Sequence, residues 1–405
     1  MSDRQFDYEV VASPLHDRSH LADLFTKVGE RLGNIGGVGA AGSMSSAMPF
    51  VIVVGTGGSE QQVIERWESR QASVSGEPAL IVAHEADNSL PAALEALAAI
   101  RQADGRGRIV MLDRVGDVAA AVHDQRAFLA LHHCRLGVVG SPSDWLVASV
   151  PTGAVVKDRW GPTLVPVEVP GAVDVRPTAT AVQLGGRWAN VDAVGRVDRD
   201  EVDRAASVHG PLVDLMASHE LDAVTVRCFD LLSTTMTSGC IALAEMNASG
   251  VIAGCEGDVP SALAMLWVKE LFGATAWMAN PASVEPDAGR IELAHCTVAP
   301  NLVETLSLDT HFESGIGIGI AGQFRPQPVT LIRIGGRQLE QVWLADGELV
   351  ANGSKDHLCR TQASVLIASD RARELLERPL GNHVVMISGH HQEQLQRWWN
   401  VFIES

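Results

Sequence analysis

The first part of the chain alternates short apolar runs with longer segments in which apolar residues recur at helical spacing. The runs FVIVVG, ALIVA, RIVML and LGVVG, which begin at residues 50, 79, 108 and 136, contain almost no polar positions. Such continuous runs are typical of parallel strands that are covered on both faces. The helical segments between them predict a doubly wound parallel sheet, and we expect this first α/β domain to span residues 1–150.

The middle of the chain continues the α/β pattern after a break. In the first domain, the segment over residues 88–102 is expected to be a helix that Ser89 caps, with Pro91 in the first turn. Residues 151–200 are rich in Pro, Gly and Val, and we expect them to be irregular. Helical spacing resumes over residues 198–220 and precedes a strand within residues 222–230. A second doubly wound α/β domain is therefore expected over residues 151–290.

The pattern changes after residue 290. Short strand-like segments now follow one another, separated by glycine or polar turns, as in IELAHCTVA, PVTLIRIGG, EQVWLADGELV, ASVLIAS and HVVMISG. This spacing predicts a β-rich C-terminal domain over residues 291–405, built as a barrel or a curled sheet.

Composition limits the classes of function. The chain has 405 residues, a formal net charge of −18, 46% hydrophobic residues and 20% charged residues, which is typical of a folded soluble protein with more than one domain. The negative charge makes nucleic acid and anionic membranes unexpected partners. We expect neither a signal peptide nor a membrane span, because the start is charged and every apolar run is short. The six cysteines form no CxxC pair, so we expect them to be reduced and the protein to be cytoplasmic.

The glycine loop VVGTGG, residues 53–58, is the first candidate site. It lies where a strand should pass into a helix, which is a common position for a phosphate. The loop lacks both GxGxxG and the GK[ST] of a P-loop. It therefore favours a tight turn over a nucleotide site, with a small polyol or sugar in contact with the turn as a further alternative.

The segment CEGDVP, residues 255–260, places two acids where a buried strand should pass into a buried helix. Glu256 and Asp258 are two residues apart and would face one pocket if the strand continued. Helix capping accounts for them poorly, because Pro260 favours the first helical position and would make Val259 the cap. Two neighbouring acids raise each other's pKa unless a cation lies between them, so the pair favours a metal or an acid/base role.

Several other polar side chains are placed near predicted strand ends. His383 directly precedes a strand, His295 ends one, and His311 and Glu313 adjoin a glycine-rich segment. Each of these alone is more often structural than functional. Acids and imidazoles without a thiolate cluster suit Mn²⁺ or Mg²⁺ better than a structural zinc.

Two roles are possible for the side chains of Arg360 and Gln362, in LCRTQ. Their side chains either fix substrate hydroxyls or bond the backbone.

The chain resembles the L-fucose isomerase and L-arabinose isomerase group, and most of all its compact fucose isomerase-like members. The resemblance runs along most of the chain. It rests on the motifs VVGTGGSE, NSLPAALEALA, RLGVVGSPSDWLVAS, EMNASGVIAGCEGDVPSALAMLW, MANPASV, LAHCTVAP, THFESGIGIGIAGQF, LCRTQ and PLGNHVVMISG. The order of these motifs, rather than any one of them, indicates the superfamily.

The resemblance implies two α/β domains followed by a β-rich domain, and a metal-dependent interconversion of an aldose and a ketose. The expected cofactor is Mn²⁺, with Mg²⁺ or Co²⁺ as alternatives. Asp258 and His383 fall at the positions of the family's metal-binding aspartate and histidine, and Asn382, His295, His311, Glu313, Arg360 and Gln362 are expected to contact the sugar. Relatives assemble as homo-oligomers in which one subunit covers its neighbour's site, so the same is expected here.

This sequence departs from the family at one position. The family's further metal-binding and acid/base glutamate should lie some two dozen residues before Asp258, but that window reads STTMTSGC and contains no acid. Glu256, Glu313 and Glu245 are the candidates to replace it, in that order.

The function expected from the sequence is a metal-dependent aldose–ketose isomerase that acts on a sugar or modified sugar through a cis-enediolate, with Glu256 and Asp258 as catalytic groups and Glu256, Asp258 and His383 as metal ligands. A metal holds the carbonyl and hydroxyl oxygens while a carboxylate moves the proton. An epimerase, aldolase or lyase would share the enediolate and is the main alternative. A sugar-binding protein without activity is the third class, but unpaired buried carboxylates argue against it.

Overall fold

The computed structural model describes residues 4–40, 45–169, 179–193 and 197–404. The chain divides into two compact units. The first comprises Met1–His132 together with Arg397–Ser405, and the second comprises His133–Gln396. Each unit has its own sheets and is described by itself.

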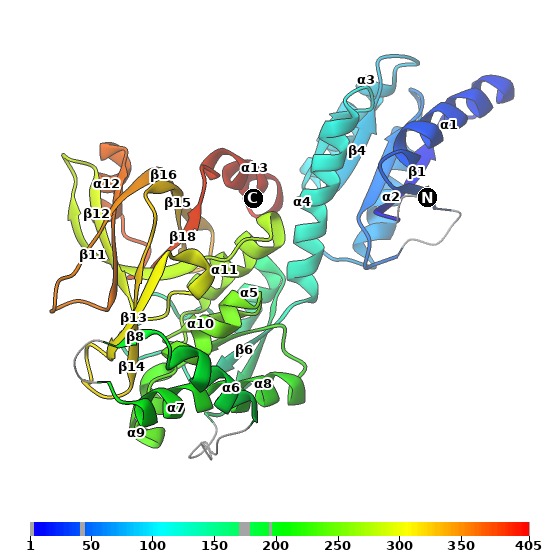
Figure 1. The fold of residues 1–405 in the computed structure, drawn as a ribbon. Helices are drawn as coiled ribbons and strands as arrows, with labels where there is room; N and C mark the ends of the chain where they lie inside the picture. The colour runs from blue at the N-terminus through cyan, green and yellow to red at the C-terminus, as the bar shows by residue number, and fades with distance from the viewer. Residues whose placement is uncertain (1–3, 41–44, 170–178, 194–196, 405) are drawn as a thin grey trace. The chain divides into compact units, whose positions relative to one another are not determined.

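The first unit is a doubly wound α/β sheet (Figure 1). Its strands pair in parallel in the order β2-β1-β3-β4-β5. The elements are β1 (Phe6–Val11), α1 (Arg18–Gly33), β2 (Gly37–Gly39), β3 (Phe50–Val54), α2 (Glu60–Gln71), β4 (Ala79–Ala83), α3 (Ser89–Gln102), β5 (Gly107–Met111) and α4 (Val115–His133).

Both faces of this sheet are buried. Ile52 and Val54 pack in one apolar cluster with residues of α2 and α3, whereas Val51 and Val53 pack in the other with residues of α1 and α4. Successive side chains of a strand point to opposite faces, so a strand covered on both sides must be apolar throughout. The uninterrupted run FVIVV is thereby explained.

The start of α3 corrects one expectation from the sequence. Ser89 is the first helical residue and not the cap, which is Asn88 in a left-handed conformation with no side-chain capping bond. Ser89 Oγ instead donates to Val54 O and accepts from His84 N, so the hydroxyl ties the helix to β3 and the end of β4. Pro91 lies in the first turn, as predicted.

The second unit begins with a smaller parallel sheet in the order β10-β9-β6-β7. The elements around it are β6 (Arg135–Val139), α5 (Gly153–Trp160), β7 (Thr163–Val167), α6 (Ala179–Trp188), α7 (Arg199–Ser207), α8 (His209–Ser218), β9 (Ala223–Val226), α9 (Cys228–Thr235), α10 (Cys240–Ala248), β10 (Ile252–Cys255) and α11 (Val259–Phe272). Although β6 precedes residue 150, it belongs to this sheet.

The expectation that residues 151–200 are irregular is wrong for the part that the structure describes. β7 is a strand and α5 and α6 are helices; residues 170–178 and 194–196 lie outside the described residues. Pro166 obscured the strand in the sequence. β7 lies at the edge of its sheet, where a residue without a backbone N–H is tolerated.

A closed six-stranded barrel follows, as the sequence predicted in outline (Figure 1, yellow-green to red). Its order is β11-β12-β17-β16-β15-β18. The elements of this region are β11 (Trp277–Glu285), β12 (Arg290–His295), η1 (Pro300–Leu302), β13 (Thr305–Thr310), β14 (Ile318–Gln323), β15 (Gln327–Gly335), β16 (Gln341–Asn352), β17 (Thr361–Ile367), α12 (Ser369–Glu377) and β18 (Val384–Ser388). The last helix, α13 (Gln392–Phe402), begins in the second unit and ends in the first. β13 and β14 form a separate small sheet with β8 (Asp192–Ala193).

α11 joins the parallel sheet to the barrel. It contacts β9 and β10, and it also contacts β11, β15 and β18 of the barrel. A helix that is covered on all sides is expected to be apolar on all sides, and α11 has the sequence VPSALAMLWVKELF. Its N-terminus therefore lies where the sheet and the barrel meet.

None of the helices in the described part of the chain combines the length and apolar character of a membrane span.

Candidate active site

The candidate site starts from the turn between β10 and α11. Glu256 and Gly257 both have left-handed backbones, with φ of +62° and +71°. A Cβ on Gly257 would lie 2.8 Å from Pro142 Cα and 2.9 Å from Ser141 O, so this position accepts only glycine. A left-handed conformation is unfavourable for a glutamate and has to be held by its surroundings. Ser143 N helps to hold it by donating to Glu256 O at 2.9 Å.

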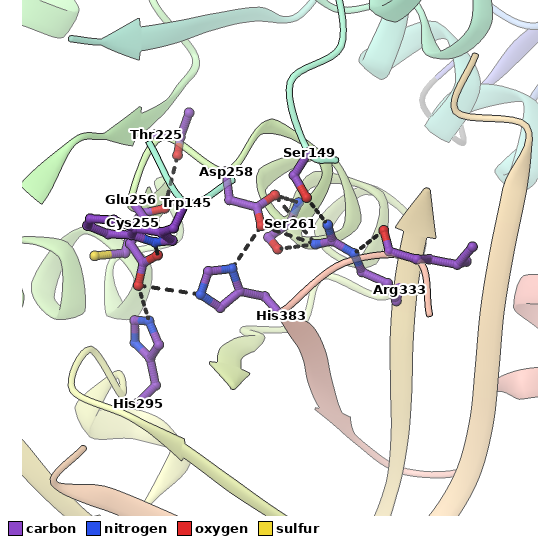
Figure 2. A network of polar contacts seen from close by, with 11 residues as sticks. Trp145, Ser149, Thr225, Cys255, Glu256, Asp258, Ser261, His295, Arg333 and His383 are labelled. Atoms are coloured by element: carbon purple, nitrogen blue, oxygen red, sulfur yellow. Dashed lines mark hydrogen bonds and ion pairs between the residues drawn. The ribbon is translucent and has the colours of Figure 1, made fainter. Parts of the chain in front are cut away.

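The Glu256 carboxylate is buried and is shared among three side chains (Figure 2). Trp145 Nε1 donates to Oε2 at 2.5 Å. Oε1 lies 3.4 Å from His383 Nε2 and 3.9 Å from His295 Nε2. Burial opposes ionisation of Glu256, but the two imidazoles outweigh it and hold its pKa below the usual value. The carboxylate is therefore ionised and directed at two histidine nitrogens.

The imidazole ring of His383 is held in one orientation by a contact at its Nδ1 atom. It immediately precedes β18, as predicted, and is fully buried. Its Nδ1 lies 2.8 Å from Asp258 Oδ2, whereas its Nε2 makes no hydrogen bond. Burial favours the neutral imidazole, but the hydrogen bond to Asp258 and the negative charge of Glu256, 3.4 Å from Nε2, outweigh it and raise the pKa of His383 to about 9. A buried polar atom without a hydrogen bond is rare in native proteins, so the state of His383 Nε2 has to be explained.

Asp258 has three partners. Its side chain accepts from Ser261 N at 2.8 Å, which makes it the N-cap of α11. The expectation that Val259 would be the cap is wrong, because the helix begins at Val259 and Pro260 occupies its second position. Arg333 Nη1 also contacts Asp258 Oδ2, at 3.1 Å. Burial opposes the charge on Asp258, but Arg333 and His383 outweigh it and hold its pKa well below the usual range.

Arg333 is a site residue that the sequence did not reveal. It comes from β15 and is almost fully buried. Besides Asp258, it donates to the hydroxyls of Ser261 and Ser149. In Figure 2, Ser149, Ser261 and Arg333 lie to the right of His383 and above it, whereas Glu256 lies to its left. An arginine in an otherwise strand-like run, TLIRIG, was the only signal, and its partner lies 75 residues earlier.

His295 completes the cluster. It ends β12, as predicted, and is buried. Its Nδ1 lies 2.8 Å from Thr297 Oγ1, and its ring meets that of His383 edge-on with the centroids 5.8 Å apart. Burial, and then the neighbouring His383, lower the pKa of His295 to about 4. One ligand atom each from Glu256, His295 and His383 lies within 4.8 Å of the other two.

These three residues fit a metal ion on the evidence of their own geometry. Both histidines use Nδ1 for a fixed partner and direct Nε2 at the same carboxylate. Metal-binding histidines are usually oriented in this way by their second nitrogen. The absence of a hydrogen bond at His383 Nε2 also fits a nitrogen that is reserved for a ligand. The described residues hold one other such group, His16, His20 and Asp87 in the first unit, and it is partly exposed.

Two cavities adjoin the cluster. One of about 330 Å³ is lined by Trp145, Phe229, Glu256, Asn280, Glu313 and Asn382. The other, of about 30 Å³, is lined by Cys228, Phe229, Cys240, Cys255, Glu256, Asn280, His295, Cys296, Thr297, His311, Glu313 and Cys359. The structure thus brings five predicted residues to these walls: Glu256, His295, His311, Glu313 and Asn382. The larger volume is that of a small ligand site with aromatic and amide walls.

Three other candidates lie elsewhere. Arg360 Nε donates to Thr310 O, and the Gln362 amide bonds Lys355 and Cys359 of the backbone, which is the second of the two roles. Neither residue lines the two cavities. Glu245 in α10 accepts from Trp188 Nε1 at 2.6 Å and pairs with Arg187. It is therefore part of the packing between α10 and α6.

The fold and this cluster define an α/β protein with a C-terminal barrel and a buried candidate metal site where the sheet meets the barrel. No family model matches the chain. Over 180 residues it is 23% identical to the sulfoquinovose isomerases of Priestia aryabhattai and of Priestia megaterium (strain ATCC 12872 / QMB1551). The match covers 43% of this chain and 40% of each relative. The chain is therefore similar, over part of its length, to an isomerase named for a sugar.

Proposed function

We propose that this protein is an aldose–ketose isomerase that acts on a sugar or modified sugar and depends on a divalent metal. The main observation in support of the proposal is the buried cluster of Glu256, His295 and His383 at the edge of the 330 Å³ cavity. The partial similarity to sulfoquinovose isomerases supports a sugar substrate. The resemblance to fucose and arabinose isomerases supports the same reaction class.

The ligands that we assign differ in one residue from those expected by resemblance. Glu256, His295 and His383 would hold the ion, and Asp258 would orient His383, because the oxygens of Asp258 already serve Ser261, Arg333 and His383. Two imidazoles and one carboxylate suit Mn²⁺ or Co²⁺ better than Mg²⁺, which prefers oxygen ligands. When bound, the metal would act as a Lewis acid toward the carbonyl and hydroxyl oxygens of the sugar.

A carboxylate that is not committed to the metal is available to transfer the proton. Glu313 lines both cavities and is an exposed residue. Burial, and then the charge on Glu256, raise the pKa of Glu313 above its usual value. A raised pKa makes a carboxylate a stronger base. We therefore assign Glu313 to remove the proton from one sugar carbon and return it to the neighbouring carbon.

The remaining walls of the cavity would orient the sugar. Trp145 and Phe229 present rings that meet edge-on with centroids 4.9 Å apart. Aromatic rings offer apolar surface for the C–H faces of a sugar. Asn280 and Asn382 line the same cavity with amides that can donate to hydroxyls and accept from them. This combination of apolar and amide walls is common in pockets for small polar ligands.

The test is solvent-proton exchange. Protein supplied with Mn²⁺ is incubated in deuterium oxide with a panel of aldoses and ketoses, and products are followed by NMR. Conversion of an aldose to its ketose, with deuterium entering next to the carbonyl and activity lost on adding chelator, is the expected result. Epimers or cleavage products would instead favour the epimerase, aldolase or lyase alternatives. No exchange with any sugar, together with no bound metal, would refute the proposal.

The proposal includes an oligomeric assembly, and this part rests only on the resemblance to the fucose and arabinose isomerases. We infer a homo-oligomer in which one subunit completes its neighbour's site. Light scattering in solution tests it, and a monomer at working concentration would contradict it.

A further inference from the structure

The cysteines gather at the candidate active site. Five of the six, namely Cys228, Cys240, Cys255, Cys296 and Cys359, line the 30 Å³ cavity, and all six are free thiols. The sixth, Cys134, precedes β6 and lies outside this lining. The proposed isomerisation uses none of these thiols, so their concentration around one small cavity needs a separate explanation.

Two of them are close enough to react with each other. Cys255 ends β10, and Cys228 begins α9, with one residue between it and the end of the neighbouring strand β9. Both side chains are buried, and their Sγ atoms are 2.7 Å apart. A disulfide has a sulfur–sulfur distance of about 2.05 Å, so the bond requires a movement of roughly 0.6 Å. Cys255 pairs with Val226, the last residue of β9, so the parallel pairing of β10 and β9 keeps Cys228, two residues further on, close to Cys255.

A small reagent can reach this pair through the active site. The small cavity shares Phe229, Glu256, Asn280 and Glu313 with the 330 Å³ cavity, so the two adjoin one another. Larger thiol reagents would be excluded by the size of the inner cavity. The chemistry that fits is therefore a two-electron oxidant about the size of a water molecule or slightly larger.

We propose that Cys228 and Cys255 are a redox modification site, converted to a disulfide by hydrogen peroxide. The hydrogen bond with Cys228 and burial raise the pKa of Cys255, so we assign the attack to Cys228. Its sulfur attacks a peroxide oxygen, the O–O bond breaks, and a sulfenic acid and one water form. The second sulfur then displaces the hydroxyl group, which leaves as a second water, and the S–S bond forms. Two thiols lose two electrons and two protons, and one peroxide is reduced to two waters.

The disulfide would act on Glu256, which follows Cys255 in the chain. The left-handed turn at Glu256 is set by the end of β10, and Cys255 O accepts from Asp258 N in that turn. Drawing Cys255 toward Cys228 displaces this turn by a fraction of an ångström. Metal sites are sensitive to such displacements because ligand distances are fixed within narrow limits. Oxidation therefore weakens metal binding; this consequence rests on the proposed function, whereas the disulfide itself does not.

The experiment treats the native protein with hydrogen peroxide, blocks the remaining thiols under denaturing conditions, and maps the peptides by mass spectrometry. The expected result is a fall in titratable thiols from six to four, with one cross-linked peptide joining Cys228 to Cys255. Cys134→Ala is the matched control and should give the same cross-link. A thiol reductant should restore all six thiols.

A native protein that keeps all its thiols, or one that forms a link between Cys296 and Cys359 instead, overturns the proposal. The Cys228→Ala variant should form no such link, but the peptide map of the unaltered chain decides the matter even if that variant folds poorly. Mn²⁺ titration of the oxidised and reduced forms tests the consequence for Glu256. We expect at least a threefold weaker affinity after oxidation, and equal affinities would refute the coupling.

Discussion

His383 Nδ1 and Asp258 Oδ2 lie 2.8 Å apart, and this contact fixes which nitrogen of the imidazole faces the site. An ionised carboxylate can only accept hydrogen bonds, so Nδ1 carries the proton and Nε2 is the nitrogen left facing Glu256. Asp258 is in turn held by Arg333 and by the backbone of α11. The orientation of one histidine ring therefore depends on a buried network that reaches from the parallel sheet to the barrel.

Replacing Asp258 with Asn tests this dependence. The amide keeps the shape of the side chain but removes the charge that balances Arg333. We expect Mn²⁺ affinity to fall by about 10- to 100-fold, as is usual when an outer partner of a metal-binding histidine is changed. The free energy of unfolding should fall by about 3–5 kcal/mol, because a buried charge loses its partner. Mn²⁺ titration and urea denaturation measure the two effects.

A double variant separates the two effects. Adding Arg333→Met to Asp258→Asn removes the uncompensated charge and should recover part of the stability without recovering metal affinity. If Asp258→Asn kept full metal affinity, Asp258 would be a helix cap and ion-pair partner only.

Glu256→Gln and Glu313→Gln form a matched pair, since each removes one charge and keeps the shape. Glu256→Gln should lose metal affinity, because the amide is a poor ligand beside two imidazoles. Glu313→Gln should keep the metal and lose roughly two to four orders of magnitude in turnover, as expected for a missing general base. Metal titration alongside isomerase assays distinguishes them. The reverse pattern would make Glu256 the base, as the sequence first indicated.

Trp145→Phe removes the hydrogen bond to Glu256 Oε2 while keeping an aromatic ring against Phe229. A hydrogen bond to a charged group contributes about 1.5–3 kcal/mol. About half of the Trp145 side chain is exposed, so water can replace the lost donor in part. We therefore expect metal affinity to fall by no more than about tenfold, with little change in unfolding midpoint. A complete loss of metal binding would indicate that Trp145 positions the whole turn.

The thiol of Cys134 offers a test by pH. Burial, and then the charges of Asp222 and Glu270, raise the pKa of Cys134 to about 12. Only about 1 in 10,000 molecules would then carry the thiolate at pH 8, since each unit of pKa is a factor of ten. Iodoacetamide should therefore spare Cys134 in the native protein at pH 8 and modify it after unfolding. Rapid native alkylation at Cys134 would contradict this.

The sequence predicted the fold better than it predicted the partners within the site. Runs such as FVIVV identify parallel strands because a strand that is buried on both faces is apolar at every position, and this pattern is visible in the sequence itself. The strand over 163–167 was missed because Pro166 is a poor strand residue except at a sheet edge, and edges are known only after the strands pair. His383 and Glu256 were found from their places at strand ends. Arg333 and Trp145 were not, because each acquires its role only through a residue distant in the chain.

The contact between Asp258 and Arg333 also affects the order in which parts of the protein can fold during synthesis on the ribosome. Asp258 is made 75 residues before Arg333 and 125 residues before His383. Until those later segments emerge, a nascent chain that buried the start of α11 would bury an uncompensated carboxylate, which is strongly unfavourable. We therefore expect the helix to stay undocked until the barrel strands have been made, and the sheet and barrel of the second unit to complete their folding together. A chain truncated before β15 is expected to be held open and to be a substrate for chaperones and proteases.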